Sequence, residues 1–182
     1  MDKRVEENLR VKNQIAKAYF SLLKQRGVAE AENISVTAIT ERAGVSRMAY
    51  YRNFSRKTEI VEFYVQETVW SELEKRLNEN TPFWSVEYGI LFFSVLKDNR
   101  DLFLLLEQHG YLGLLLESFN AKNEELAGDM PRGSIERYNL YYAAGASLNA
   151  AMIWLREGCR ESTRAMAESF CRFAISSNKS FH

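Results

Sequence analysis

Proline and glycine are scarce in this sequence of 182 residues, which contains two prolines and nine glycines. Both residues interrupt regular secondary structure, so their scarcity favours long helices joined by few turns. Hydrophobic residues make up 46% of the chain, which is sufficient for a sizeable core. We therefore predict an all-α protein, built as one compact domain or as a small domain joined to a larger one.

Residues that carry metal or nucleophilic chemistry are also few, since the chain has two cysteines and two histidines. Cys159 and Cys171 are predicted to be buried, reduced thiols. His109 and His182 have no Cys or carboxylate neighbours at ligand spacing, so no metal site and no cofactor are expected. No nucleophile–base pair or cluster of carboxylates is visible, which argues against an enzyme.

Long apolar runs are missing as well. The longest, such as residues 102–106, are far too short to span a bilayer. The first seven residues contain no apolar segment of the kind found in a signal peptide. We expect a cytoplasmic protein that has no membrane partner.

The net charge of zero conceals an asymmetry along the chain. Residues 1–60 contain 12 Lys plus Arg and 7 Asp plus Glu, a net charge of +5, whereas the remaining residues carry −5. A basic amino-terminal third followed by an acidic remainder suits a nucleic-acid-binding head on a body that avoids nucleic acid.

The most informative stretch runs from residue 36 to residue 60. An apolar pattern at helical spacing (Val36, Ile39) ends at Gly44, which suits the left-handed backbone that closes a helix. Ser46 can then cap a second short helix through residue 53. Two short helices joined by such a turn form a helix-turn-helix unit, although the same pattern also occurs at ordinary helical corners. Donors and aromatic residues on the second helix favour DNA binding.

This stretch resembles the signature of the tetracycline-repressor (TetR) family. The resemblance is carried by Ala43-Gly44-Val45-Ser46-Arg47, by Tyr50-Tyr51-Arg52-Asn53-Phe54 and by Lys57, and it covers positions from about 11 to 60. The sequence departs from the family at Asn53, where many members carry His, and at Met48-Ala49, where Gly or Ser followed by Thr is common. A weaker resemblance, in residues 154–162, points to a TetR subgroup related to dihydroxyacetone-kinase operon regulators.

The resemblance implies a three-helix DNA-binding domain over residues 1–55 and a helical effector-binding and dimerisation domain over residues 56–182. It also implies a dimer on a near-palindromic double-stranded operator, most often as a repressor. The predicted phosphate contacts are Thr37, Tyr51, Asn53 and Lys57. Ser46 starts the helix that enters the major groove, and Arg47, Met48 and Ala49 are predicted to read base edges.

Beyond residue 55, apolar periodicity predicts one long helix over residues 55–80 and further helices over 83–99, 99–110, 111–127, 134–158 and 162–176. The last two contain small and apolar residues on one face, which fit either an intramolecular core or the family's dimer interface. We predict the interface, made of Ala143, Ser147, Ala150, Trp154, Met166, Phe170 and Phe173.

The body is rich in aromatic residues, which either pack as a solid core or line an apolar cavity for a small molecule. The residues predicted to line an effector pocket are Tyr88, Phe92, Phe103, His109, Tyr138, Tyr142 and Asn149. Because no cluster of Arg or Lys lies nearby, we expect a neutral or cationic, largely hydrophobic effector that releases DNA. The alternative is a DNA-binding regulator without an effector, controlled by a protein partner.

Overall fold

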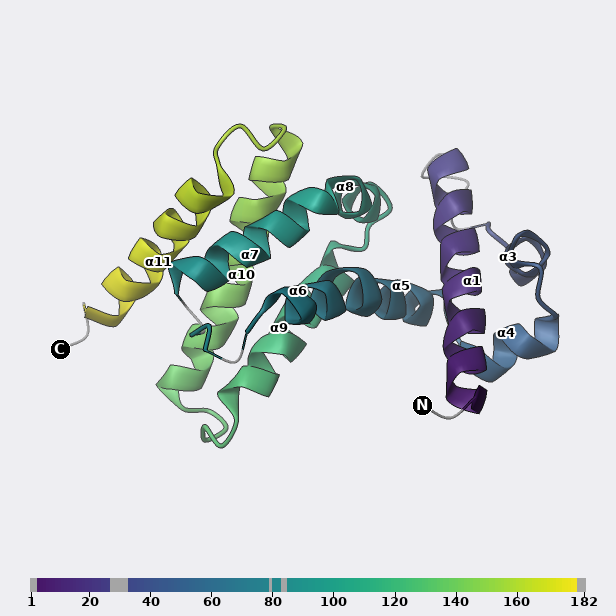
Figure 1. The fold of residues 1–182 in the computed structure, drawn as a ribbon, viewed down its shortest axis with the longest axis horizontal. Helices are drawn as coiled ribbons and strands as arrows, with labels where there is room; N and C mark the ends of the chain where they lie inside the picture. The colour runs from purple at the N-terminus through teal and green to yellow at the C-terminus, as the bar shows by residue number, and fades with distance from the viewer. Residues whose placement is uncertain (1–2, 27–32, 79, 83–84, 180–182) are drawn as a thin grey trace.

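The computed structural model describes residues 3–26, 33–78, 80–82 and 85–179, and all regular structure in these residues is helical. The prediction of an all-α fold is therefore confirmed. The molecule is elongated, with a small helical head at one end and a larger helical body at the other (Figure 1). The last helix of the chain lies on the side of the body away from the head (Figure 1).

The head contains α1 (Lys3–Gln25), α3 (Val36–Ala43) and α4 (Arg47–Asn53). Helix α1 is the longest of the three. It packs across both short helices and buries Ile15, Tyr19 and Leu23 against them and the connecting helix. The predicted helix-turn-helix is present between α3 and α4.

The connection from head to body was predicted as one long helix, and it is helical without interruption from Lys57 to Arg76, but with a π turn inside it that was not predicted. It consists of α5 (Lys57–Val65), the π-helix η1 (Gln66–Trp70) and α6 (Ser71–Arg76). Ser55 does not cap α5, because its N–H donates to the Glu59 carboxylate and Arg56 takes the capping position. Helix α6 ends at Arg76, four residues before the predicted end.

The π-helix brings the buried residues of the connector into phase. An α-helix turns by about 100° per residue, so an uninterrupted helix would rotate Val69, Trp70 and Leu73 away from the face that buries Ile60 and Val61. The wider π turn takes up one additional residue. All five side chains are consequently almost fully buried in one continuous core.

The body is made of five helices, which are α7 (Val86–Asp98), α8 (Arg100–Gln108), α9 (Leu112–Ala127), α10 (Ile135–Arg156) and α11 (Thr163–Lys179). Helix α11 packs closely along α7, whereas α10 packs mainly on α9 and α8. A Cβ placed on Gly89 of α7 would lie 2.8 Å from the Cβ of Ala167 in α11, so the close approach of these helices requires glycine.

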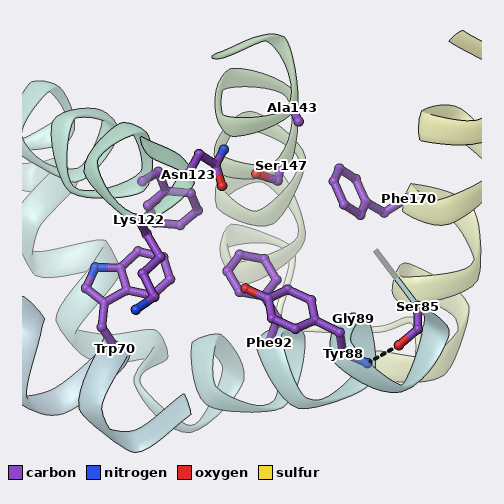
Figure 2. A pocket seen from close by; sticks show the side chains of 11 residues that line it. Trp70, Ser85, Tyr88, Gly89, Phe92, Lys122, Asn123, Ala143, Ser147 and Phe170 are labelled. Carbon is purple, nitrogen blue, oxygen red and sulfur yellow. Dashed lines mark hydrogen bonds between the residues drawn. The ribbon is translucent and has the colours of Figure 1, made fainter. Parts of the chain in front are cut away.

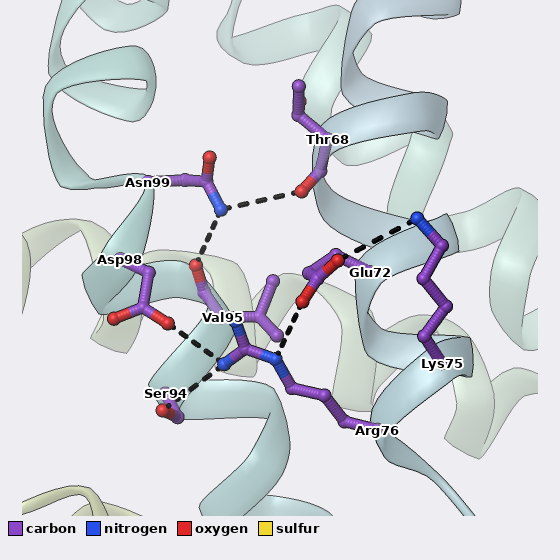
Figure 3. Close-up of polar contacts among 8 residues, drawn as sticks. All are labelled: Thr68, Glu72, Lys75, Arg76, Ser94, Val95, Asp98 and Asn99. Carbon is purple, nitrogen blue, oxygen red and sulfur yellow. Dashed lines mark hydrogen bonds and ion pairs between the residues drawn. The ribbon is translucent and has the colours of Figure 1, made fainter.

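Polar side chains fasten the end of the connector to α7 (Figure 3). The Arg76 guanidinium donates to Asp98 at 2.8 Å and to Glu72 at 3.0 Å. These hydrogen bonds, led by that of Asp98, raise the pKa of Arg76. The Asn99 amide donates to the carbonyl of Thr68, inside the π-helix, at 3.4 Å. The irregular part of the connector is thus held by the α7–α8 junction.

None of the described helices combines the length and apolarity needed to cross a membrane. Both cysteines are buried thiols, as predicted.

Candidate nucleic-acid interface and internal cavity

The turn between α3 and α4 has the geometry expected of a helix-turn-helix unit. Gly44 adopts a left-handed conformation (φ 66°), and its N–H closes the end of α3 on the carbonyls of Thr40 and Glu41. The Ser46 hydroxyl oxygen accepts from the N–H of Ala49 at 3.0 Å and caps α4. Tyr50, which is 1% exposed, fixes α4 to the core of the head. One side of this short helix is therefore held against the core, and its other sides face solvent.

The predicted DNA contacts lie mainly on the solvent side of this unit. Thr37, Ser46, Arg47, Met48 and Tyr51 are exposed, and Ala49 is half-buried on the flank of α4. Ser35 caps α3 through the N–H of Ala38, so Thr37 stands in the first turn of a properly closed helix. These side chains form one surface on the outer end of the head.

Two of the predicted phosphate contacts are more constrained than expected. The Asn53 amide donates back to the Ala49 carbonyl at 2.7 Å, and its Oδ1 is buried without a partner, so the structure does not present this side chain as a free phosphate donor. The Lys57 ammonium donates to the Ile34 carbonyl at 3.3 Å. This contact keeps Lys57 beside the start of α3, where Thr37 is exposed.

Arg52 was missed by the sequence analysis. It is exposed on α4, two residues after the buried Tyr50, and therefore on the side of the helix opposite the core. The sequence contains a signal for this position, because a residue two places after a buried helical residue lies on the opposite side of the helix.

A cavity with a volume of about 30 Å³ lies among the described residues of the body, and five of its eleven lining residues are aromatic (Figure 2). That volume accommodates about one water molecule. Tyr88 and Phe92 line it, as predicted. The remaining lining residues come from the connector and from α7, α9, α10 and α11, and they are Trp70, Ser85, Gly89, Phe119, Lys122, Asn123, Ala143, Ser147 and Phe170.

The aromatic rings of the cavity contact one another. Phe92 stacks on Tyr88 and on Trp70, with 6.4 Å between the ring centroids in each pair, and meets Phe119 edge-on. The Trp70 indole N–H donates to the Ser118 hydroxyl. Burial raises the pKa of Tyr88, so its hydroxyl remains neutral over the physiological range.

Lys122 is the charged residue of the lining, and sequence analysis missed it. Its ammonium bonds to Glu74 at 2.5 Å and to Glu125 at 2.8 Å. The carboxylates raise its pKa although burial acts in the opposite direction. An anionic ligand group would have to compete with both carboxylates, which is consistent with the expectation of a ligand without negative charge.

The other residues predicted to line the pocket lie elsewhere. Phe103 is buried in the core on α8, and His109 lies in the α8–α9 turn with both ring nitrogens buried and unpartnered. Tyr138, Tyr142 and Asn149 are exposed on α10. The aromatic content of the body indicated a cavity. Which side of α10 faces that cavity, and which side faces solvent, becomes clear only from the structure.

The predicted dimer residues on α10 also need correction. Ala143, Ser147 and Trp154 are buried within their own chain, where Trp154 meets Phe93 edge-on and the other two line the cavity. Ala150 is exposed at the edge of the outer face. On α11, Met166 and Phe170 are half-buried against the core, and Phe173 is 49% exposed.

A row of side chains, all exposed except the half-buried Ala146, runs along the opposite side of α10 at spacings of three and four residues. The large members are Ile135, Tyr138, Tyr142 and Ile153, and their exposed fractions reach 72% at Ile135. Ala146 and Asn149 lie between them on the same side. We refer to these six residues as the outer face of α10.

No family model and no curated protein matches this chain. Among solved structures it is similar to the fatty acid degradation regulator FadR from Bacillus halodurans. The TM-score is 0.50 at 19% sequence identity, and the match covers 91% of this chain and 94% of that chain. Because the match spans both chains almost completely, this chain shares the fold of that regulator through head and body.

Proposed function

We propose that this chain is a TetR-like one-component transcriptional regulator, and most often such a protein acts as a repressor. The observation that carries the proposal is the closed helix-turn-helix. In this unit, Ser46 caps α4 and the buried Tyr50 holds it against the core. Its solvent side presents the exposed side chains of Arg47, Met48 and Tyr51. Such a helix fits the major groove of double-stranded DNA. The similarity to a fatty acid degradation regulator supports the same class.

The direct test is selection of binding sites from random double-stranded DNA with the full-length protein. We expect enrichment of a near-palindrome whose half-sites are about one helical turn, roughly 34–36 Å, or a multiple of it apart. Failure to enrich any sequence at low salt would contradict the proposed function.

Replacing Lys57 by alanine is expected to weaken binding about equally on all sequences and to lower the salt slope by roughly one unit. The reason is that Lys57 places a cation beside Thr37 at the start of α3. Lys57→Gln keeps a donor for the Ile34 carbonyl but removes the charge, so its salt slope should equal that of Lys57→Ala. The measurement is operator affinity across a salt series.

Lys75→Ala provides the matched control, since Lys75 is an exposed lysine on the connector, remote from α4 and paired with Glu72. It should leave the slope unchanged. An unaltered slope in both Lys57 variants would remove this residue from the interface.

Dimerisation, in this proposal, uses the outer face of α10 rather than the buried residues Ala143, Ser147 and Trp154. Ile135, Tyr138, Tyr142 and Ile153 are large apolar side chains left in solvent on one side of one helix. The small Ala146 between them allows a second helix to approach closely. A second copy would bury the same face by two-fold symmetry.

The effector, in this proposal, is a small, largely apolar, uncharged or cationic molecule bound in the cavity between α7, α9 and α10. At about 30 Å³ the cavity must widen to accept it. Widening would displace Trp70, which lies both in the cavity wall and in the connector. The same connector stacks Tyr64 on Phe20 of α1, with 4.3 Å between the ring centroids. A displaced connector would therefore reorient the head.

A thermal-shift screen with uncharged apolar compounds is expected to give hits that stabilise the protein and weaken operator binding. Ala143→Leu should abolish the stabilisation because the added carbons occupy the cavity. Ala121→Leu, an identical change at an exposed site on α9, should preserve it. Hits that leave operator affinity unchanged at saturation would refute the regulatory role of the cavity.

The small volume of the cavity favours a second candidate, a DNA-binding regulator without a small-molecule effector that is controlled by a protein partner. A screen that yields no stabilising compound, with operator binding intact, would support this candidate.

A further inference from the structure

Met48 is the most exposed large apolar side chain of the head, with 69% of its surface accessible. It follows Ser46 by two residues and so belongs to the first turn of α4. In a helix that turns by about 100° per residue, a position two residues before the buried Tyr50 points almost directly away from the core. Met48 therefore lies at the centre of the solvent side of α4.

The surroundings of Met48 are suited to close contact with DNA. Arg47 and Arg52 are exposed on the same short helix and supply positive charge. Ala49 on the flank is small, which lets the helix backbone approach the groove. The first turn of a recognition helix is the part that reaches base edges. Met48 is thus an apolar side chain at the position where a polar reader would be expected.

The major groove offers one prominent apolar group to such a side chain, the 5-methyl group of thymine. Opposite guanine, adenine or cytosine, Met48 would instead cover hydrogen-bonding groups that it cannot satisfy. The flexible thioether can follow the position of the methyl group without strict geometry.

We propose that Met48 reads a thymine in each operator half-site through the 5-methyl group. This inference rests on the proposed function, because it requires that α4 enters the major groove. The inference goes further, because it specifies which base is read at one operator position. The residue that would read this base, Met48, is one at which the sequence departs from the family it resembles.

The experiment removes only the methyl group. After an operator has been selected, each thymine is replaced in turn by deoxyuridine, which pairs identically. We expect one thymine per half-site whose replacement weakens binding about fourfold, as for the loss of one buried methyl group worth about 0.8 kcal/mol. In Met48→Ala the same replacement should have almost no effect.

Two further variants make the assignment specific. Met48→Leu keeps an apolar side chain and should retain the dependence on the methyl group. Met48→Gln should lose this dependence and shift the preference at that position toward adenine, which a glutamine amide can bind by two hydrogen bonds. Tyr51→Phe, on the flank of α4, serves as a control that should leave the deoxyuridine effect intact.

If the protein binds a selected operator but no thymine shows an effect that depends on Met48, the inference is wrong and the proposed function stands. If no operator can be selected with any salt concentration, both are wrong.

Discussion

Replacing Ile153 by arginine is expected to convert the proposed dimer into monomers and to lower operator affinity on the order of a hundredfold, because two linked heads bind far more tightly than one. Ile153 is 43% exposed and lies at the carboxyl end of the outer face of α10. If two copies of this helix cross here, the introduced arginine would place an unpaired charge against apolar side chains, which costs several kcal/mol. Sedimentation and operator binding measure the two effects.

Leu116→Arg is the matched control for this prediction, since Leu116 is 37% exposed on α9. It should leave both the assembly and operator affinity unchanged. A dimer that survives Ile153→Arg, with a normal circular dichroism spectrum, would place the interface on another surface. If Leu116→Arg alone produced monomers, the outer face of α10 would be excluded.

The second large effect concerns stability, and it has opposite signs at two glycines. Gly89→Ala is expected to lower the free energy of unfolding by about 2 kcal/mol, as is typical of overpacking. The added Cβ would lie 2.8 Å from the Cβ and 3.2 Å from the Cα of Ala167, so the backbones of α7 and α11 must separate. The melting temperature should fall by roughly 4–8 °C.

Gly113→Ala is the same change in α9, where no heavy atom lies within 4 Å of the added Cβ. Here the higher helix propensity of alanine acts alone and should stabilise the protein by up to about 1 kcal/mol. Removing the opposing methyl group in the double variant Gly89→Ala, Ala167→Gly should recover part of the loss. Equal melting temperatures for Gly89→Ala and the unaltered protein would show that α7 and α11 separate without penalty.

Local signals in the sequence were sufficient to predict the head. Gly44 and Ser46 determine the turn through their own backbone and side-chain preferences, and the spacing of Val36, Ile39 and Tyr50 identifies the side that is buried. These features act within a few residues. The same spacing places Met48 outward, and it would have placed Arg52 there as well.

The body was predicted less accurately because its faces depend on packing between distant helices. Ala143 and Ser147 are small, and small residues suit a helix crossing within a chain as well as one between chains. Only the position of α9 and α7 around α10 assigns them to the inside. Likewise, Tyr142 is indistinguishable from a cavity residue until the helix is oriented.

The π-helix was missed for a different reason. The apolar residues of the connector recur at spacings of three and four and were read as one stripe, although a rotation of 100° per residue already carries Val69 and Leu73 away from the face of Ile60 and Val61. The structure accounts for this mismatch through the hydrogen bond from the Ser71 N–H to the Gln66 carbonyl.

The position of Trp70 has a thermodynamic consequence. It lines the cavity, and Tyr64 of the same connector stacks on Phe20 of the head. If filling the cavity lowers the affinity for operator by some factor, then operator must lower the affinity for the effector by the same factor. If the proposed function holds, the protein bound to its operator would therefore be a poorer sensor than the free protein. Cells with more copies of the operator would need more effector for the same response.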